Sequence, residues 1–421
     1  MTITEKIIAR HCDRKAVSPG ETIFVRCDIA MGSEIIFPQV NNLISDLGWK
    51  DHILQDRVAL INGHLVSTKE AAAGTLVAMM DKFASQMKIE RYYQAGKSGD
   101  CQSLLGSQGL IGPGELGVGS DQHFTTYGAL GALATGVGGV DLAMIWTTGE
   151  TWLTVPGSAR ITLTGRLKPG VISKDLAFHI LGTLGAEKVH GMALEFIGDG
   201  LEQLSIHDRF MLCNLTVETG ARFAIMPVDN ITREYLLSTK YQKDVQPVIA
   251  DPDAEYAMEF TFDLGEVVPM VATPYMPTSV MRVDELQEIS VDQVVIGSCT
   301  SGRIEDFRMI AKLLENHELS HRVRLGLFPS SHQTVRDIVD EGLALFFTRK
   351  GASISPPSCQ PCLGSGPSLL GENEIGIYTT NRNYRGRHGP ASAKVFLAGP
   401  LVAIASAITG VITDPRELLS N

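Results

Sequence analysis

Short apolar segments alternate with amphipathic helical segments along most of the chain, and this alternation constrains the fold more than any other feature. Strands are predicted at residues 58–61, 159–164 and 294–296. Apolar residues spaced three or four apart predict helices at 69–86, 174–184 and 304–314. Because strands that alternate with helices form largely parallel sheets, the pattern predicts an α/β protein with functional residues at the carboxyl ends of strands.

Three α/β domains around a central cleft are predicted, at residues 1–156, 157–276 and 277–421. The length of 421 residues suits two or three domains. Glycine recurs irregularly over 96–141 among apolar residues, which indicates close backbone packing around a site rather than a linker. The segment 269–277 (PMVATPYMP) holds three prolines and is the best candidate for a linker.

Composition and charge narrow the classes of partner. Hydrophobic residues make up 44% of the chain and charged residues 20%, which is enough apolar material for a sizeable core. The formal net charge of −11 argues against nucleic acid, so an anionic substrate would need a local cluster of arginines. The sequence contains no long apolar run typical of a membrane span, and its start (MTITEKIIARHCDRK) does not resemble a secretory signal. With seven cysteines and no disulfide-like pattern, we expect a reducing, cytoplasmic setting.

Two cysteine motifs carry the strongest chemical signal. Cys299 lies in a GSCTSG segment between a buried strand and a helix, and Cys359 and Cys362 form a C-x-x-C pair in a loop rich in proline and glycine. The positive end of a helix dipole favours a thiolate, and a C-x-x-C loop can present two more. Three interpretations stay open on spacing alone. They are a structural zinc site, a redox pair, and a [4Fe–4S] cluster with one open iron.

Five segments together resemble the aconitase superfamily, and more closely the large subunits of 3-isopropylmalate dehydratase and homoaconitase. They occur in the family's order and extend almost from end to end. The segments are GELGVGSDQHFTTYGALGALATGVGGVD (114–141), VVIGSCTSGRIEDFR (294–308), CQPCLG (359–364), NRNYRGRHG (381–389) and SAITGVITDP (406–415).

The resemblance implies a [4Fe–4S] hydro-lyase that dehydrates and rehydrates a hydroxy acid. Cys299, Cys359 and Cys362 would bind three irons, and the fourth iron would act as a Lewis acid on the substrate's hydroxyl and a carboxylate. Asn214 and Asn381 match family residues close to the cluster.

The resemblance also implies roles in proton transfer and substrate binding. His123 matches a family histidine that pairs with Glu218, and a neighbouring carboxylate raises the pKa of an imidazole. Arg382 and Arg387 match family arginines near the substrate, and guanidinium groups bind carboxylates in a bidentate fork.

This sequence departs from the family around those residues. The family's Asp-His pair is Gly63-His64, a second active-site histidine is Gln102, and a small residue near the substrate is Gln122. Asp121, the usual partner of that second histidine, is present. Further differences are Ser33-Glu34 in place of an early His-Asp, and Ser67 in place of a proline. We therefore expect His64 to be less basic, protonation of the hydroxyl to depend on His123 and Glu218, and the substrate to differ from the family's commonest one.

The resemblance also implies a separate partner subunit, and two alternative functions stay open. The family's swivelling domain supplies a base serine and a substrate-binding arginine, and the chain ends at Asn421, where the third domain would end. A separate small subunit is therefore expected to carry that domain. The main interpretation is a large subunit that acts on a substituted malate, as in 3-isopropylmalate dehydratase. The alternatives are a relative acting on homoaconitate, 2,3-dimethylmalate or another hydroxy acid, and a cluster-bearing binding protein without turnover.

Overall fold

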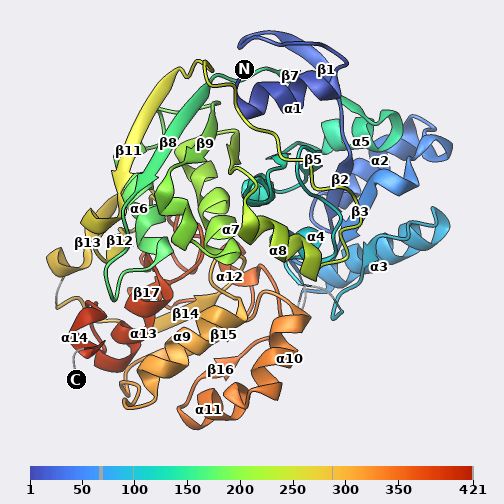
Figure 1. Cartoon of the computed structure of the whole chain (residues 1–421). Coiled ribbons are helices and arrows are strands. Elements are labelled where there is room, and N and C mark those ends of the chain that lie inside the picture. Colours follow the sequence, from blue (N-terminus) through green and yellow to red (C-terminus); the bar gives the residue numbers. More distant parts are fainter. Residues whose placement is uncertain (66–69, 98, 287, 420–421) are drawn as a thin grey trace.

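Largely parallel sheets covered by helices form the body of the protein (Figure 1). This computed structural model describes residues 1–65, 70–97, 99–286 and 288–419. Ser67 and Lys69, which figured in the sequence predictions, lie outside the described residues. The predicted α/β fold class is confirmed.

The first sheet contains five parallel strands in the order β4-β3-β2-β5-β6. Its strands are β2 (Ile29–Ser33), β3 (Val58–Ile61), β4 (Tyr92–Tyr93), β5 (Leu116–Gly119) and β6 (Leu133–Gly136). A separate antiparallel ribbon pairs β1 (Thr22–Arg26) with β7 (Glu150–Thr154). The helices of this region are α1 (Ile3–His11), α2 (Phe37–Asp46), α3 (Ala71–Gln86), α4 (Cys101–Ser107) and α5 (Gly139–Thr148).

A parallel four-stranded sheet follows, in the order β10-β9-β8-β11. Its strands are β8 (Ser158–Thr164), β9 (Ala193–Ile197), β10 (Phe223–Ile225) and β11 (Met258–Asp263). The helices here are α6 (Ser173–Leu184), α7 (Ile206–Leu215) and α8 (Asn230–Ser238).

The third sheet has seven strands in the order β13-β12-β18-β17-β14-β15-β16. They are β12 (Met270–Ala272), β13 (Val280–Arg282), β14 (Gln293–Gly297), β15 (Arg324–Phe328), β16 (Ser353–Ile354), β17 (Ile375–Tyr378) and β18 (Lys394–Ala398). Its helices are α9 (Ile304–Leu314), α10 (His332–Asp340), α11 (Leu343–Arg349), α12 (Gln360–Leu363), α13 (Pro400–Thr409) and α14 (Arg416–Leu419). No helix in the described ranges has the length and apolar character needed to cross a bilayer.

The prediction of a linker at 269–277 is wrong over its first part. Residues Met270 to Ala272 form β12, which pairs with β13 on one side and β18 on the other. Val271 and Ala272 are fully buried. The apolar Met-Val-Ala run therefore extends the third sheet, and the predicted domain boundary at 276/277 falls after this strand. The three domain ranges themselves stay a proposal.

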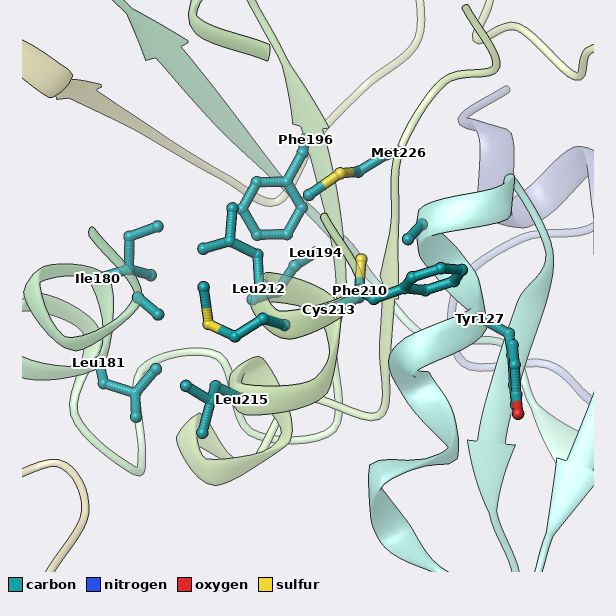
Figure 2. Packing of buried hydrophobic residues seen from close by; sticks show 14 of the residues in the cluster. Tyr127, Ile180, Leu181, Leu194, Phe196, Phe210, Leu212, Cys213, Leu215 and Met226 are labelled. Atoms are coloured by element: carbon teal, nitrogen blue, oxygen red, sulfur yellow. The ribbon is translucent and has the colours of Figure 1, made fainter. Parts of the chain in front are cut away.

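Helix α7 ties the second sheet to the glycine-rich segment of the first region. Leu212 and Leu215 on α7 lie among Ile180, Leu181 and Phe196, and Phe210 extends towards Tyr127 on the other side (Figure 2). Tyr127 belongs to η3, a 3-10 segment spanning Gln122–Leu130. This packing fixes the C-terminal end of α7 against η3, where polar residues of both meet.

The contact between η3 and β10 leaves no room for a side chain at Gly128. A Cβ atom at Gly128 would lie 1.6 Å from the carbonyl oxygen of Ala224. We expect Gly128→Ala to lower the free energy of unfolding by about 1–3 kcal/mol, because β10 must move away from η3. Chemical denaturation followed by circular dichroism measures this.

Gly74 provides the matched control. It lies in α3, and a Cβ atom there has no neighbour within 4 Å. Gly74→Ala is expected to raise stability by about 0.5–1 kcal/mol, because glycine weakens a helix interior. Equal effects of the two substitutions would contradict close packing of η3 on β10.

Candidate functional site

The candidate site lies where the carboxyl ends of the first and third sheets meet. Glu34, His64 and Asp121 follow the neighbouring parallel strands β2, β3 and β5. From the third sheet, Cys299 follows β14 and Asn381 follows β17, which pair in parallel. This is the sheet edge at which α/β proteins place their ligand sites.

Two buried amides contact the sulfur of Cys299. Asn214 at the end of α7 and Asn381 point their Nδ2 atoms at Cys299 Sγ, at 3.5 and 3.3 Å. Asn381 Nδ2 also donates to Asn214 Oδ1 at 2.9 Å, and its own Oδ1 accepts from Thr300 Oγ1 at 2.8 Å. A hydrogen bond with Cys359 lowers the pKa of Cys299 to about 5 against the effect of burial, and the charge of His123 acts in the same direction. Cys299 is therefore prepared to be a thiolate.

The other two cysteines, Cys359 and Cys362, lie on a loop that contacts the first region of the chain. The amide N–H of Cys359 donates to the carbonyl of Gly63 at 2.8 Å, and its thiol lies 3.7 Å from Gln102 Oε1. Arg387 Nε donates to the carbonyl oxygen of Cys362 at 2.5 Å. Gln102, which stands where the family has an active-site histidine, and Arg387, predicted to lie near the substrate, thus contact the cysteine loop.

The donor set fits a cluster with several irons better than a single ion. Cys299, Cys359 and Cys362 are all buried, and thiolate sulfur is the usual ligand of iron–sulfur clusters. Within the part of the chain that the structure describes, no three His, Cys, Asp or Glu side chains gather tightly enough for a single metal ion. A structural zinc site needs four ligands around one ion, so this arrangement does not fit that interpretation.

His123 is the centre of a buried chain of charges. Its Nε2 lies 2.8 Å from Glu218 Oε1, and its Nδ1 lies 3.0 Å from Asp121 Oδ1. Burial alone would lower the pKa of His123, but the two carboxylates outweigh burial and raise the pKa to about 10. The pKa of Asp121 is held well below its ordinary value, since hydrogen bonds from His123 and His64 outweigh burial. His123 therefore carries a proton at neutral pH between two ionised carboxylates.

The same chain continues towards the surface through Arg382. Arg382 Nε donates to Glu218 Oε1 at 2.7 Å, and its Nη2 donates to Gln122 Oε1 at 2.5 Å. Tyr384 lies beside Glu218, with its hydroxyl 3.5 Å from Oε2. Gln122, which replaces a small residue of the family, thus orients the guanidinium group of Arg382.

The expectation that His64 would be less basic is wrong. Burial lowers the pKa of His64, but Cys101, Asp121 and Glu34 together raise it well above its ordinary value. Nε2 of His64 lies 3.4 Å from Asp121 Oδ2, and Nδ1 lies 3.7 Å from Glu34 Oε2. Carboxylates that follow β2 and β5 lie beside His64, which the Asp-His motif alone does not show.

Sequence reasoning also missed Lys174, which supports the Cys299 loop from behind. This buried side chain donates to Thr300 Oγ1 at 2.8 Å, to Ser301 Oγ at 3.0 Å and to the carbonyl of Thr379. Desolvation lowers the pKa of Lys174 to about 8. A lysine in the first turn of a helix is ordinarily exposed, so no signal in the sequence distinguished it.

Lys174→Met should loosen the Cys299 loop. The change removes the donor of three buried acceptors, which we expect to cost about 1–3 kcal/mol of unfolding free energy. Denaturation of the full chain measures it. Lys312→Met on the exposed face of α9 is the control and should stay within about 0.5 kcal/mol of the parent. A loss no larger than that of the control would show that Lys174 does not support the loop.

The pH dependence of stability should reveal the raised pKa of His123. A pKa raised from 6.5 to about 10 contributes stability that is complete below pH 6.5 and disappears as the pH rises to about 10. The paired carboxylates must be ionised, so the contribution also falls below about pH 5. We expect the melting temperatures of the parent and His123→Gln to differ by several degrees at about pH 5–6.5 and to converge towards pH 10. A difference that does not vary with pH would contradict the paired imidazolium.

Comparison with known proteins gives an independent view of the chain. The sequence pattern of the Aconitase family (aconitate hydratase) matches residues 40–288 and 282–410. A 3-isopropylmalate dehydratase large subunit from Moorella thermoacetica is 41% identical over 419 residues, which cover 100% of this chain and 99% of the relative. A protein of the same name from Clostridium kluyveri is 38% identical and covers 100% of both chains.

A solved structure supports the fold alone. The holo-form of aconitase X from Thermococcus kodakaraensis superposes with a TM-score of 0.53 and 13% sequence identity, over 86% of this chain and 84% of the other. The family pattern and the full-length relatives confirm the resemblance to the aconitase superfamily and the hydro-lyase class predicted from the sequence. The chain belongs to the aconitase family.

Proposed function

We propose that this chain is the large subunit of a [4Fe–4S] hydro-lyase that removes water from a substituted malate and adds it back, with 3-isopropylmalate as the nearest known substrate. The observation that carries the proposal is the buried set of Cys299, Cys359 and Cys362 beside a protonated histidine, in a chain that matches such large subunits over its full length. When bound, the cluster supplies an open iron as a Lewis acid for the substrate's hydroxyl.

The arginines of the site bind the substrate's carboxylates in this proposal. Arg382 is held by Glu218 and Gln122, so its guanidinium plane is fixed before a substrate arrives. A fixed guanidinium group loses little entropy when it forms a bidentate pair with a carboxylate. Arg382 and Arg387 are the cationic groups that we expect to attract an anionic substrate to this site of an acidic protein.

His123 and Glu218 hold the proton that the leaving hydroxyl needs. The hydrogen bond between His123 Nε2 and Glu218 Oε1 is 2.8 Å long, and both side chains are buried. A proton shared across this bond can pass to a hydroxyl that would otherwise leave as hydroxide. Asp121 holds the opposite side of the imidazole ring and keeps it charged.

A separate small subunit is part of the proposal. Relatives that align with this chain from end to end carry the name of a large subunit. We propose that the partner brings the base that removes the neighbouring proton and a further carboxylate-binding arginine, and that the complex is cytoplasmic.

Metal analysis of the anaerobically purified chain tests the cluster. After mild oxidation we expect an EPR signal typical of a [3Fe–4S] centre that is lost when ferrous iron restores [4Fe–4S]. Cys359→Ser should lose iron and sulfide and keep its circular dichroism, because the sheets carry the core. Cys12→Ser, at a half-buried thiol on the end of α1, should retain the cluster. Stoichiometric zinc in the parent chain would overturn the proposal.

Activity is tested with the reconstituted chain, a cognate small subunit and a panel of malates. Formation of a conjugated unsaturated acid raises ultraviolet absorbance, and the largest rise is expected with 3-isopropylmalate. A preference for homoaconitate or 2,3-dimethylmalate would assign the chain to another hydroxy acid. A flat trace with every substrate, in protein that holds the cluster, would favour a binding protein without turnover.

A further inference from the structure

Glu34 is a fully buried carboxylate at the carboxyl end of β2, and it holds the turn that carries His64. Its Oε1 accepts the backbone N–H groups of His64 at 2.6 Å and Leu65 at 2.7 Å. Its Oε2 accepts the N–H of Gly63 at 3.2 Å and lies 3.7 Å from His64 Nδ1. Three backbone donors and one ring nitrogen thus converge on a single carboxylate.

No carboxylate can stand at position 63 without movement of the chain. A Cβ atom on Gly63 would lie 2.6 Å from the carbonyl oxygen of Gly99, which is closer than such atoms approach. The obstacle is backbone, and Gly99 is itself confined, because it bridges to Ser331 of the third region. The charge that His64 needs must therefore come from another element.

The surroundings of His64 show which groups can supply that charge. Asp121 reaches Nε2 at 3.4 Å, but it is shared with His123, which it contacts at 3.0 Å. The thiol of Cys101 lies 3.8 Å from Nδ1 and helps to raise the pKa of His64, but burial raises the pKa of Cys101 itself to about 11, whereas the pKa of Glu34 is lowered. Glu34 is the carboxylate on the Nδ1 side of the ring.

We propose that Glu34 is the positioning residue for His64 and takes the place of a carboxylate at position 63. In the family, Asp121 pairs with the histidine that is Gln102 in this chain. Here Asp121 contacts both His64 and His123. The polar chain of the site then runs without a break from Arg382 through Glu218, His123, Asp121 and His64 to Glu34. The part of this inference that concerns proton transfer rests on the proposed function, whereas the contacts of Glu34 do not.

Through Gly63, Glu34 also affects the position of the cysteine loop. Gly63 donates its N–H to Glu34 and accepts the N–H of Cys359 through its carbonyl at 2.8 Å. A displaced Gly63 would therefore move both the ring of His64 and the anchor of Cys359. Glu34 couples the geometry of the proton-holding residues to that of the cysteine loop.

Titration of the His64 ring in the full chain tests the assignment. Ring nitrogen chemical shifts are followed from pH 5 to pH 10, and the signal is assigned by its loss in His64→Gln. Glu34→Gln keeps the size of the side chain and removes its charge, so we expect the titration midpoint of His64 to fall by about one pH unit or more. Glu150→Gln, at an exposed acid of β7, should leave the midpoint unchanged. An unchanged midpoint in folded Glu34→Gln would overturn the proposal.

Two further variants keep the test decisive if Glu34→Gln does not fold. Glu34→Asp keeps the charge but shortens the side chain by one carbon, and we expect a smaller fall of the midpoint in the same direction. Adding Gly63→Asp to either Glu34 variant should not restore the midpoint, because the Gly99 carbonyl occupies the space. Restoration by Gly63→Asp, or a parent-like midpoint in Glu34→Asp, would contradict the assignment.

Enzyme assays separate this inference from the proposed function. In the reconstituted complex, Glu34→Gln is expected to lower kcat about 10-fold or more with KM little changed, since proton transfer typically contributes at least that much. Its pH profile should move together with the midpoint of His64. If the parent has no activity but the midpoint shifts, the proposed function fails and the role of Glu34 stands. If the parent is active and the midpoint stays, the reverse holds.

Discussion

The ion pairs of His123 organise the whole site. One imidazolium lies between the buried carboxylate of Glu218 and the half-buried carboxylate of Asp121, and each carboxylate reaches a second cation, His64 on one side and Arg382 on the other. Buried charges are tolerated only when they are paired and hydrogen-bonded, and removing one partner of such a pair typically costs about 3–5 kcal/mol. His64 and Asp121 follow β3 and β5, His123 lies in η3, Glu218 lies in the 3-10 turn after α7 (Thr216–Thr219), and Arg382 lies in the loop after β17. The ion pairs therefore join segments from all three regions of the chain.

A second polar cluster supports the cysteine side of the site. Lys174 crosses from α6 to the loop after β14, and Asn214 and Asn381 reach the sulfur of Cys299 from two other elements. A hydrogen bond with Cys359 and the charge of His123 lower the pKa of Cys299, and the amide of Asn381 acts in the same direction. These donors hold the Cys299 loop from three elements of the chain.

Much of the fold could be predicted from the sequence because its periodicity is regular. The strand at 58–61 and the helix at 304–314 have the predicted limits, since apolar spacing alone defines them. The strand inside 269–277 was not predicted, because the three prolines of this segment indicate a linker more strongly than its three-residue apolar run indicates a strand. The family motifs predicted that His123 lies beside Glu218 and that Asn214 lies close to the cluster cysteines. They did not place Glu34, whose function depends on two strands that pair through long-range contacts, or Lys174, whose burial depends on packing between two sheets.

The rewritten residues form one consistent change rather than separate losses. Glycine at position 63 removes a carboxylate and lets Gly99 approach, glutamate at position 34 reaches the same histidine from β2, and glutamine at position 102 turns to the cysteine loop while Asp121 turns to His64. Loss of function alone would leave a buried histidine without a partner or an orphaned acid, each at a cost of several kcal/mol. Instead each charged group in the chain from Glu34 through His64, Asp121, His123 and Glu218 to Arg382 contacts a group of opposite charge. Charges that are paired at this cost in desolvation favour a site that still transfers protons over the decay of an unused pocket.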